Sequence, residues 1–400
     1  MDSQEPSACR NHNQIAAEHC QIGLIEALHS SRKVEGLTHG FYRYPARFSP
    51  EFVRAVIEEF TKPGDCVLDS FMGGGTTIVE AIAAGRRAIG IDVNPISHFI
   101  SSAKTTPLSH HDHDGIVNWA TSVEFDEETV DDSTLYEEQL KNTPPQLAIF
   151  LSQALSSVDN LRFPRQRRFA RCVLLRLGQW ALESRSQLPD ALLMQTQLVA
   201  LTEAMLSGLD ELVEETRCYG ISKNKITSRR ALYLGTLTDP LRFGQPGTAP
   251  KLVVTSPPYP GVHVLYHRWQ VKGRRETGMP YWLAGLRDGH GPSYYTMGGR
   301  SSHGVTTYFL RLTEMFKNLR EFIRPDSLVV QLVAFPDLDR QLPAFLEAMH
   351  RAQYKEITPY ATSGCQRPSR TVPNRKWYTS CGQKKQNASV EILLFHTPMH

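Results

Sequence analysis

Two short stretches of the chain combine residue types that could do chemistry. The first, DSFMGGGTT, runs from Asp69 and places three glycines between an apolar run and a helix-like segment. The second, VVTSPPYPGV over 253–262, places Ser256, two prolines and Tyr259 directly after β-branched residues. Glycines let a backbone approach a ligand closely, and a proline pair leaves a strand as a stiff, extended segment. The first stretch therefore predicts a ligand-binding loop. The second predicts a rigid segment that holds small polar groups in fixed positions.

The glycine loop favours a nucleoside-bearing cofactor over a nucleotide triphosphate. A P-loop needs lysine after its last glycine, whereas Gly75 is followed by Thr76 and Thr77. The dinucleotide pattern needs glycine at position 78, which is Ile78. Asp92 ends the next strand-like run, where its carboxylate can accept hydrogen bonds from ribose hydroxyls. For the loop alone, a glycine-rich strand–helix turn without a ligand remains the alternative.

The elements that must position these residues alternate as in a parallel α/β sheet. GDCVLDSF over 64–71 and RAIGID over 87–92 read as buried strands, each followed by a helix-like segment. Further strands are expected at 231–236, 252–256 and 328–335. YKEITPY and SVEILLFH near the C-terminus leave no room for a helical crossover, so they are expected to pair antiparallel at the sheet edge. The pattern predicts a seven-stranded, mostly parallel sheet with a terminal antiparallel hairpin.

Composition excludes several other classes of protein. The 44 basic and 41 acidic residues give a net charge of +3, which by itself indicates no nucleic-acid partner. The seven cysteines include no C-x-x-C pair, and HHDHD over 110–114 is interpreted as a solvated acidic loop, so no metal site is predicted. Neither a signal peptide nor an apolar run of about 18 residues is present, so we expect a cytoplasmic protein without a membrane partner.

In this order the motifs resemble a known family of enzymes. D-x-F-x-G-x-G-T-T, present as Asp69 to Thr77, an acid at Asp92 and a later T-S-P-P-Y resemble the DNA amino-methyltransferases of the cytosine-N4 and adenine-N6 group. HGFYRYPARFSPEFV over 39–53 is similar to that group's motif before the glycine loop. The resemblance covers roughly 39–108 and 231–400. It implies a class I methyltransferase (Rossmann-like) fold and S-adenosyl-L-methionine as cofactor.

The resemblance also implies which residues hold the cofactor. One departure is that Gly235 precedes Thr236 where the family often has Gly-Asp, so recognition of the cofactor's adenine is expected to move to Asp239. The implied cofactor-binding residues are Phe48, Ser49, Pro50, Asp69, Phe71, Gly73, Gly75, Thr76, Thr77, Asp92 and Asn94.

The T-S-P-P-Y segment is predicted to be catalytic through Ser256, Pro257, Pro258 and Tyr259. An exocyclic amine is a poor nucleophile, and acceptors such as the Ser256 hydroxyl and the Pro257 carbonyl can orient its lone pair toward the methyl group. The Tyr259 ring is expected to stack on the base. In the family, serine before Pro-Pro is more usual for cytosine N4 than for adenine N6. The alternatives left open are adenine N6, an RNA or protein amide, and an inactive nucleic-acid-binding module.

DNA is the expected partner, and the target base must be flipped out or unpaired to reach such a site. The runs YHRWQVKGRR and GCQRPSRTVPNRKWY interleave basic and aromatic residues, which suits phosphate contact with ring stacking. The predicted DNA-binding residues are Arg268, Lys272, Arg274, Arg275, Arg367, Arg370, Arg375 and Lys376. The resemblance also implies a second kind of partner, a cognate restriction endonuclease or another phage-defence protein.

Four segments are therefore expected along the chain. Residues 1–38 form an N-terminal extension, and 39–108 hold the cofactor-binding part of the methyltransferase domain. Residues 109–230 carry apolar residues at helical spacing and are predicted to be a mostly helical insertion and a candidate DNA-recognition region. Residues 231–400 form the catalytic part with basic DNA-contacting loops.

Overall fold

The structure is a computed structural model of the chain. It describes residues 23–44, 47–125, 138–182, 187–238, 248–260, 268–271, 275–288, 297–299, 301–361, 366–371 and 390–399.

A single mostly parallel sheet organises the described part of the chain. Its strands follow the order β3-β2-β1-β4-β7-β10-β8, with β9 paired to β10. The pairs that link β3, β2, β1, β4 and β7 are all parallel. The strands are β1 (Cys66–Asp69), β2 (Arg87–Asp92), β3 (Arg230–Leu234), β4 (Leu252–Thr255), β7 (Leu328–Ala334), β8 (Tyr354–Ile357), β9 (Ser369–Thr371) and β10 (Val390–Pro398). The expected α/β fold with a mostly parallel sheet is confirmed.

The C-terminal strands differ from the prediction in two respects. β10 and β8 pair antiparallel as expected, but β10 lies between β7 and β8, so β8 and β9 form the edge next to β10. The short strand β9 adds an eighth member to the sheet. The run Ile392–Phe395 is buried on both faces, which suits an interior position, whereas β8 has exposed and half-buried residues and tolerates the edge.

Helices cover both faces of the sheet. On one face α2 (Pro50–Phe60) and α3 (Thr76–Ala83) pack over Val67 and Val254. On the other, α10 (Ser302–Leu319) and α11 (Leu338–Arg351) pack over Leu68 and Val253. Successive residues of a strand therefore face opposite helical layers. Because both faces are buried, these strands are apolar at every position and do not alternate between apolar and polar residues.

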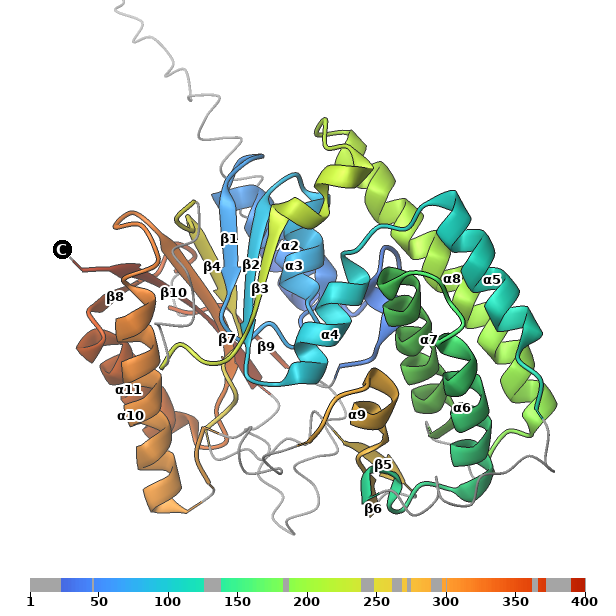
Figure 1. The fold of residues 1–400 in the computed structure, drawn as a ribbon. Coiled ribbons are helices and arrows are strands. Elements are labelled where there is room, and N and C mark those ends of the chain that lie inside the picture. The colour runs from blue at the N-terminus through green and yellow to red at the C-terminus, as the bar shows by residue number, and fades with distance from the viewer. Residues whose placement is uncertain are drawn as a thin grey trace, which may run out of the picture.

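A helical region lies beside the β3 edge of the sheet (Figure 1). It holds α5 (His110–Ser122), α6 (Pro145–Val158), α7 (Pro164–Leu182) and α8 (Ala191–Arg217), with short 3-10 turns η3 (Glu138–Leu140), η4 (Lys223–Lys225) and η5 (Thr227–Arg229). Its apolar core continues into α4 (Pro95–Lys104) and the turn η1 (His39–Phe41). HHDHD is not a loop as expected: Ser109 and Asp112 form a capping box there, so the segment begins α5.

The segment after the proline pair packs on this helical region. β5 (Trp269–Val271) and β6 (Arg275–Thr277) form a separate two-stranded sheet, and α9 (Met279–Ala284) follows. Trp269 donates its indole N–H to the Tyr42 hydroxyl at 2.8 Å, and Trp269 and Tyr281 belong to the same apolar core as α6 and α7. The described residues after the proline pair and the helical region thus share one apolar core.

None of the described helices has both the length and the apolar character that crossing a membrane requires.

Candidate active site

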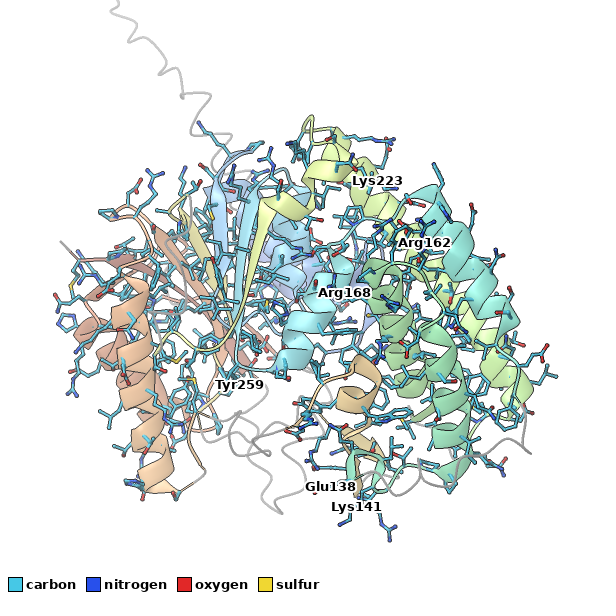
Figure 2. The ribbon with its side chains drawn as sticks, in the orientation of Figure 1. Glu138, Lys141, Arg162, Arg168, Lys223 and Tyr259 are labelled. Atoms are coloured by element: carbon cyan, nitrogen blue, oxygen red, sulfur yellow. The ribbon has the colours of Figure 1, made fainter. Side chains whose placement is uncertain are left out.

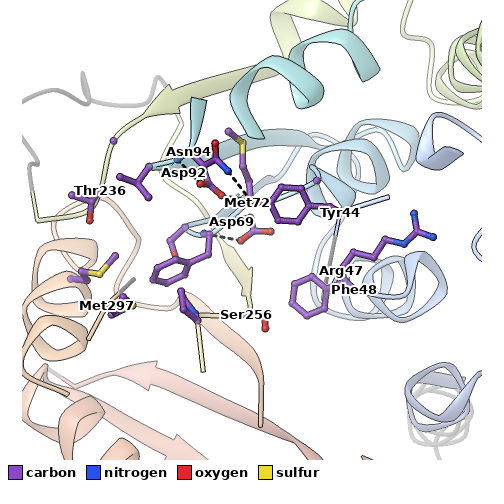
Figure 3. A pocket seen from close by; sticks show the side chains of 18 of the residues that line it. Tyr44, Arg47, Phe48, Asp69, Met72, Asp92, Asn94, Thr236, Ser256 and Met297 are labelled. Carbon is purple, nitrogen blue, oxygen red and sulfur yellow. Dashed lines mark hydrogen bonds between the residues drawn. The ribbon is translucent and has the colours of Figure 1, made fainter. Parts of the chain in front are cut away.

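A cavity of about 620 Å³ opens at the carboxyl ends of the parallel strands. The loop after β1, the end of β2, the turn after β3 and the exit of β4 all reach it, as expected for an open parallel sheet. Figure 3 shows Asp92, Asn94 and Met72 on one side of the cavity, with Ser256 and Met297 on another. The lining residues predicted from the sequence are Phe48, Asp69, Phe71, Gly73, Thr76, Asp92, Asn94, Ser256 and Pro258.

The glycine loop is shaped by close contacts that leave no space for larger residues. Gly75 has φ 75° and caps α3, and a Cβ there would lie 2.4 Å from the Ser101 hydroxyl oxygen. At Gly74 a Cβ would lie 2.8 Å from the Cβ of Tyr44. Only glycine combines a left-handed backbone with this approach, so the loop stays close to α4 and to the Tyr44 ring.

Asp92 connects the glycine loop to the end of β2. One carboxylate oxygen accepts from the Gly73 amide and the other from the Asn94 amide, both at 2.8 Å. Burial raises the pKa of Asp92 to about 6, against these stabilising hydrogen bonds. The Ser97 side chain and the Val93 amide also hydrogen-bond to this carboxylate, which lines the cavity.

Asp69 joins the glycine loop to the segment with the proline pair. Its carboxylate accepts from the Thr77 hydroxyl at 2.7 Å, the Thr255 hydroxyl at 2.8 Å and the Phe71 amide at 3.1 Å. Burial raises its pKa to about 6, since the side chain is only 1% exposed. Thr77 begins α3 and Thr255 precedes Ser256, so Asp69 fixes the two halves of the site relative to each other.

Ser256 lines the cavity with its hydroxyl proton already engaged. Its Oγ donates to the Leu332 carbonyl of β7 at 2.8 Å. The hydroxyl oxygen therefore offers lone pairs, and no proton, to a group in the cavity. Pro258 also lines the cavity, whereas Pro257 is buried and is not among the lining residues.

Tyr259 is not brought to the cavity. Its ring is 7% exposed within the core beneath α10 and α11, and its hydroxyl donates to Glu391 of β10 at 2.6 Å. In this conformation the ring cannot stack on a base in the cavity. The hydrogen bond to a buried carboxylate holds the ring in the core, which a sequence motif alone does not reveal.

The other predicted cofactor residues support the cavity without lining it. Ser49 and Pro50 begin α2, with Pro50 at the first helical position. Thr77 is engaged by Asp69, and Gly75 shapes the loop. Asp239, to which adenine recognition was assigned, lies outside the described residues.

Several lining residues were missed by the sequence interpretation. Tyr44 belongs to the motif before the glycine loop; it covers Gly73 and Gly74, and its hydroxyl lies 3.0 Å from the Ser97 hydroxyl. Arg311 and Glu314 of α10 reach the cavity from a helix without any motif, so no signal could have found them. The further unpredicted lining residues are Arg47, Ser70, Met72, Gly74, Val93, Gly235, Thr236, Thr238, Met297 and Met315.

Lys104 was also missed, and it supports the glycine loop from outside the cavity. Its ammonium donates to the Gly74 carbonyl at 2.7 Å. Burial, with a smaller contribution from the nearby Arg47, lowers the pKa of Lys104 to about 7. Lys104 thus holds Gly74 through its carbonyl, Tyr44 packs against Gly73 and Gly74, and Asp92 holds the Gly73 amide.

The arginines predicted to contact DNA are engaged within the protein where the structure describes them. Arg268 pairs with Asp288 at 2.8 Å, and Arg370 pairs with Glu391 at 2.6 Å. Arg367 makes two hydrogen bonds to Glu356, at 2.6 and 2.9 Å. Arg275 begins β6 and is exposed. The remaining predicted residues, Lys272, Arg274, Arg375 and Lys376, lie outside the described residues.

The residues of the cavity fit S-adenosylmethionine. Its volume lies within the range of small-molecule sites, and Asp92 offers an acceptor for sugar hydroxyls. Phe48 and Phe71 contribute aromatic rings, which attract a cation such as a sulfonium, and Asp69 adds a carboxylate. Gly73 and Gly74 let the backbone approach the ligand, and the Tyr44 ring closes the loop from the other side.

Comparison with known proteins points to the same chemistry over part of the chain. Residues 18–101 match the N6_N4_Mtase family model, described as DNA methylase. The chain is 44% identical over 75 residues to Type II methyltransferase M.MvaI of Kocuria varians, covering 18% of this chain and 16% of that protein. It is 46% identical over 113 residues to Type II methyltransferase M.BsoBI of Geobacillus stearothermophilus, covering 24% and 22%.

A further relative names a base. DNA adenine methyltransferase YhdJ of Escherichia coli strain K12 is 37% identical over 62 residues, covering 16% of this chain and 21% of that protein. The chain thus spans less than a quarter of the length of these relatives. The family model and the methyltransferase relatives imply S-adenosylmethionine as the methyl donor, in agreement with the sequence prediction.

Proposed function

We propose that the protein transfers a methyl group from S-adenosylmethionine to an exocyclic amine of a DNA base, and that the amine is N4 of cytosine. One observation carries the proposal: the glycine loop with Asp92 and the β4 exit with Ser256 line the same cavity. A cofactor site and a rigid acceptor for an amine therefore meet, as direct methyl transfer requires. The strand order, with reversed β10 between β7 and β8, supports a class I methyltransferase fold.

In this mechanism the bound cofactor supplies an electrophilic methyl group, and the chain orients the amine. Ser256 accepts a hydrogen bond from the amine because its own proton is committed to the Leu332 carbonyl. The Pro257 carbonyl is the proposed second acceptor. Two acceptors on one amine favour a pyramidal nitrogen with its lone pair directed away from them. Asp69 fixes the distance between these acceptors and the glycine loop, which limits reorganisation during the reaction.

The choice of cytosine rests on Ser256 before the proline pair. Adenine N6 is the second candidate, and the similarity to a protein named DNA adenine methyltransferase favours keeping it. The base itself must leave the duplex to enter the cavity. We further propose duplex DNA as the substrate and a cognate restriction endonuclease or other defence protein as a cellular partner.

The proposal is tested by product analysis. Purified protein is incubated with S-adenosylmethionine carrying a labelled methyl group and with DNA of random sequence, and the DNA is digested to nucleosides. We expect label in N4-methylcytosine. Label in N6-methyladenine would replace the proposed base, and label absent from DNA but present in RNA or protein would overturn the substrate. Ser256→Ala should slow the incorporation of label strongly without removing cofactor binding.

A further inference from the structure

The turn after β3 reaches the cavity next to Asp92, but its described residues bring no carboxylate there. The Gly235 amide donates to the Asp92 carbonyl at 2.8 Å, so the turn lies directly beside the expected acceptor for ribose. Thr236 and Thr238 also line the cavity, and their side chains are neutral. The adenine of the cofactor is bonded to its ribose and carries an exocyclic amine that donates hydrogen bonds. Near this turn, the amine therefore needs an acceptor from another element.

Helix α10 is anchored to the same turn. The Asn318 side chain donates to the Leu237 carbonyl at 2.7 Å, and Leu237 belongs to the same apolar core as Met315. Residues four apart lie on one face of a helix, one turn from each other, so the contact of Asn318 brings Glu314 toward the turn. Figure 2 shows α10 extending beyond the carboxyl ends of the strands, near which Tyr259 is labelled.

Glu314 differs from the other carboxylates that line the cavity. Asp69 and Asp92 each accept from several donors of the chain and are buried. Glu314 is exposed, and its carboxylate makes no hydrogen bond or ion pair within the part of the chain that the structure describes. It also borders a groove between α10 and α11, so it lies at the rim of the cavity. A charged acceptor is thus available to a ligand there.

The side chains around this acceptor suit a flat ring. Val93 at the end of β2, Met315 of α10 and Met297 line the cavity, and both methionines are buried. Methionine sulfur makes favourable contacts with aromatic rings. Figure 3 shows Thr236 and Met297 on one side of the cavity and Tyr44 on the other. The region between the β3 turn and α10 therefore combines apolar contacts for a purine with one carboxylate.

We propose that Glu314 accepts a hydrogen bond from the exocyclic amine of the cofactor's adenine, with Met315 in contact with the ring. This inference rests on the proposed function and names the residue that selects adenine in the same site. A carboxylate is a stronger acceptor than a hydroxyl because its hydrogen bond is charge-assisted. The acceptor expected at Asp239 in the turn is thus replaced by one on a helix.

A double-mutant cycle between protein and ligand tests this proposal. The ligands are S-adenosylhomocysteine and its analogue with hydrogen in place of the exocyclic amine, and calorimetry measures both affinities. In wild type, loss of the amine should weaken binding about 10- to 150-fold, the range for a hydrogen bond to a charged group. In Glu314→Ala the two ligands should bind with nearly equal affinity. Glu314→Gln should keep part of the preference, because its amide oxygen still accepts.

Two further variants and the second ligand serve as controls. Glu321→Ala removes an exposed carboxylate that follows α10 outside the cavity wall, and it should keep the wild-type preference. Asp239→Ala should keep it as well. The analogue without the amine should bind wild type and Glu314→Ala with equal affinity, which excludes misfolding as a cause.

The possible failures are distinguishable. A preference that survives in Glu314→Ala, a preference that is lost in Asp239→Ala, or a wild type that binds both ligands equally would overturn this inference alone. Wild type that binds S-adenosylhomocysteine with the expected preference but methylates no DNA would overturn the proposed function and support the inference. Wild type that binds neither ligand would overturn both.

Discussion

Replacing Asp92 by asparagine tests the cofactor half of the site most directly. Both carboxylate oxygens accept from backbone amides, those of Gly73 and Asn94, each at 2.8 Å. Asparagine has one oxygen and one NH₂ group, so one backbone N–H must face another donor. A backbone donor cannot reverse its role, and therefore no rotation of the side chain restores both bonds.

The size of the effect follows from these contacts. A hydrogen bond to a charged group contributes about 1.5–3 kcal/mol, and the variant loses at least one. Since the glycine loop then populates its binding conformation less, and since the charged acceptor for the cofactor is lost, we expect affinity to fall about 10- to 150-fold. Calorimetry with S-adenosylhomocysteine, the demethylated cofactor, measures this without interference from turnover.

Asp69→Asn provides the matched control. Two of the three donors to Asp69 are the hydroxyls of Thr77 and Thr255, and a hydroxyl can rotate to accept from an amide NH₂ group. One oxygen of asparagine can still serve Phe71 and Thr255, so the cofactor affinity should fall less than in Asp92→Asn. An unchanged affinity in Asp92→Asn would refute the assignment of Asp92 to the cofactor.

Three other outcomes follow from the structure. Ser256→Ala should lower turnover roughly 100-fold at unchanged affinity for S-adenosylhomocysteine, because it removes an acceptor preorganised for the reacting amine; parallel loss of both would indicate misfolding. Tyr259→Phe should lower the free energy of unfolding by about 1.5–3 kcal/mol and retain methyl transfer, because its hydroxyl binds Glu391 away from the cavity; lost turnover at unchanged stability would place the hydroxyl in the reaction. His396 is buried, and neither of its ring nitrogens has a hydrogen-bond partner among the described residues. Burial lowers its pKa from 6.5 to about 4, so its contribution to stability is full above pH 6.5 and is lost as the pH falls toward 4. Urea unfolding should show that wild type loses about 2 kcal/mol more than His396→Phe between pH 7 and pH 5, and a difference independent of pH would contradict the assignment.

Local patterns were sufficient to predict much of the fold. Apolar runs bounded by glycine or proline located β1, β2, β4 and β7, because a strand buried on both faces must be apolar throughout. These local patterns could not place β10 between β7 and β8, since the order of strands in a sheet depends on contacts between residues far apart in the chain. The charge pattern HHDHD was also misleading, because Asp112 serves as a helix cap and an ion-pair partner in a buried position.

By itself, the sequence determined the two loops of the site, because their chemistry depends on a few adjacent residues: glycines beside Asp69 and Asp92, and Ser256 before two prolines. Only the tertiary structure decided what surrounds them. It turned Tyr259 into the core, engaged Arg268, Arg367 and Arg370 with carboxylates, and brought α10 to the cavity. The reason is physical: whether a ring is buried or a charge is paired depends on neighbours far apart in the chain.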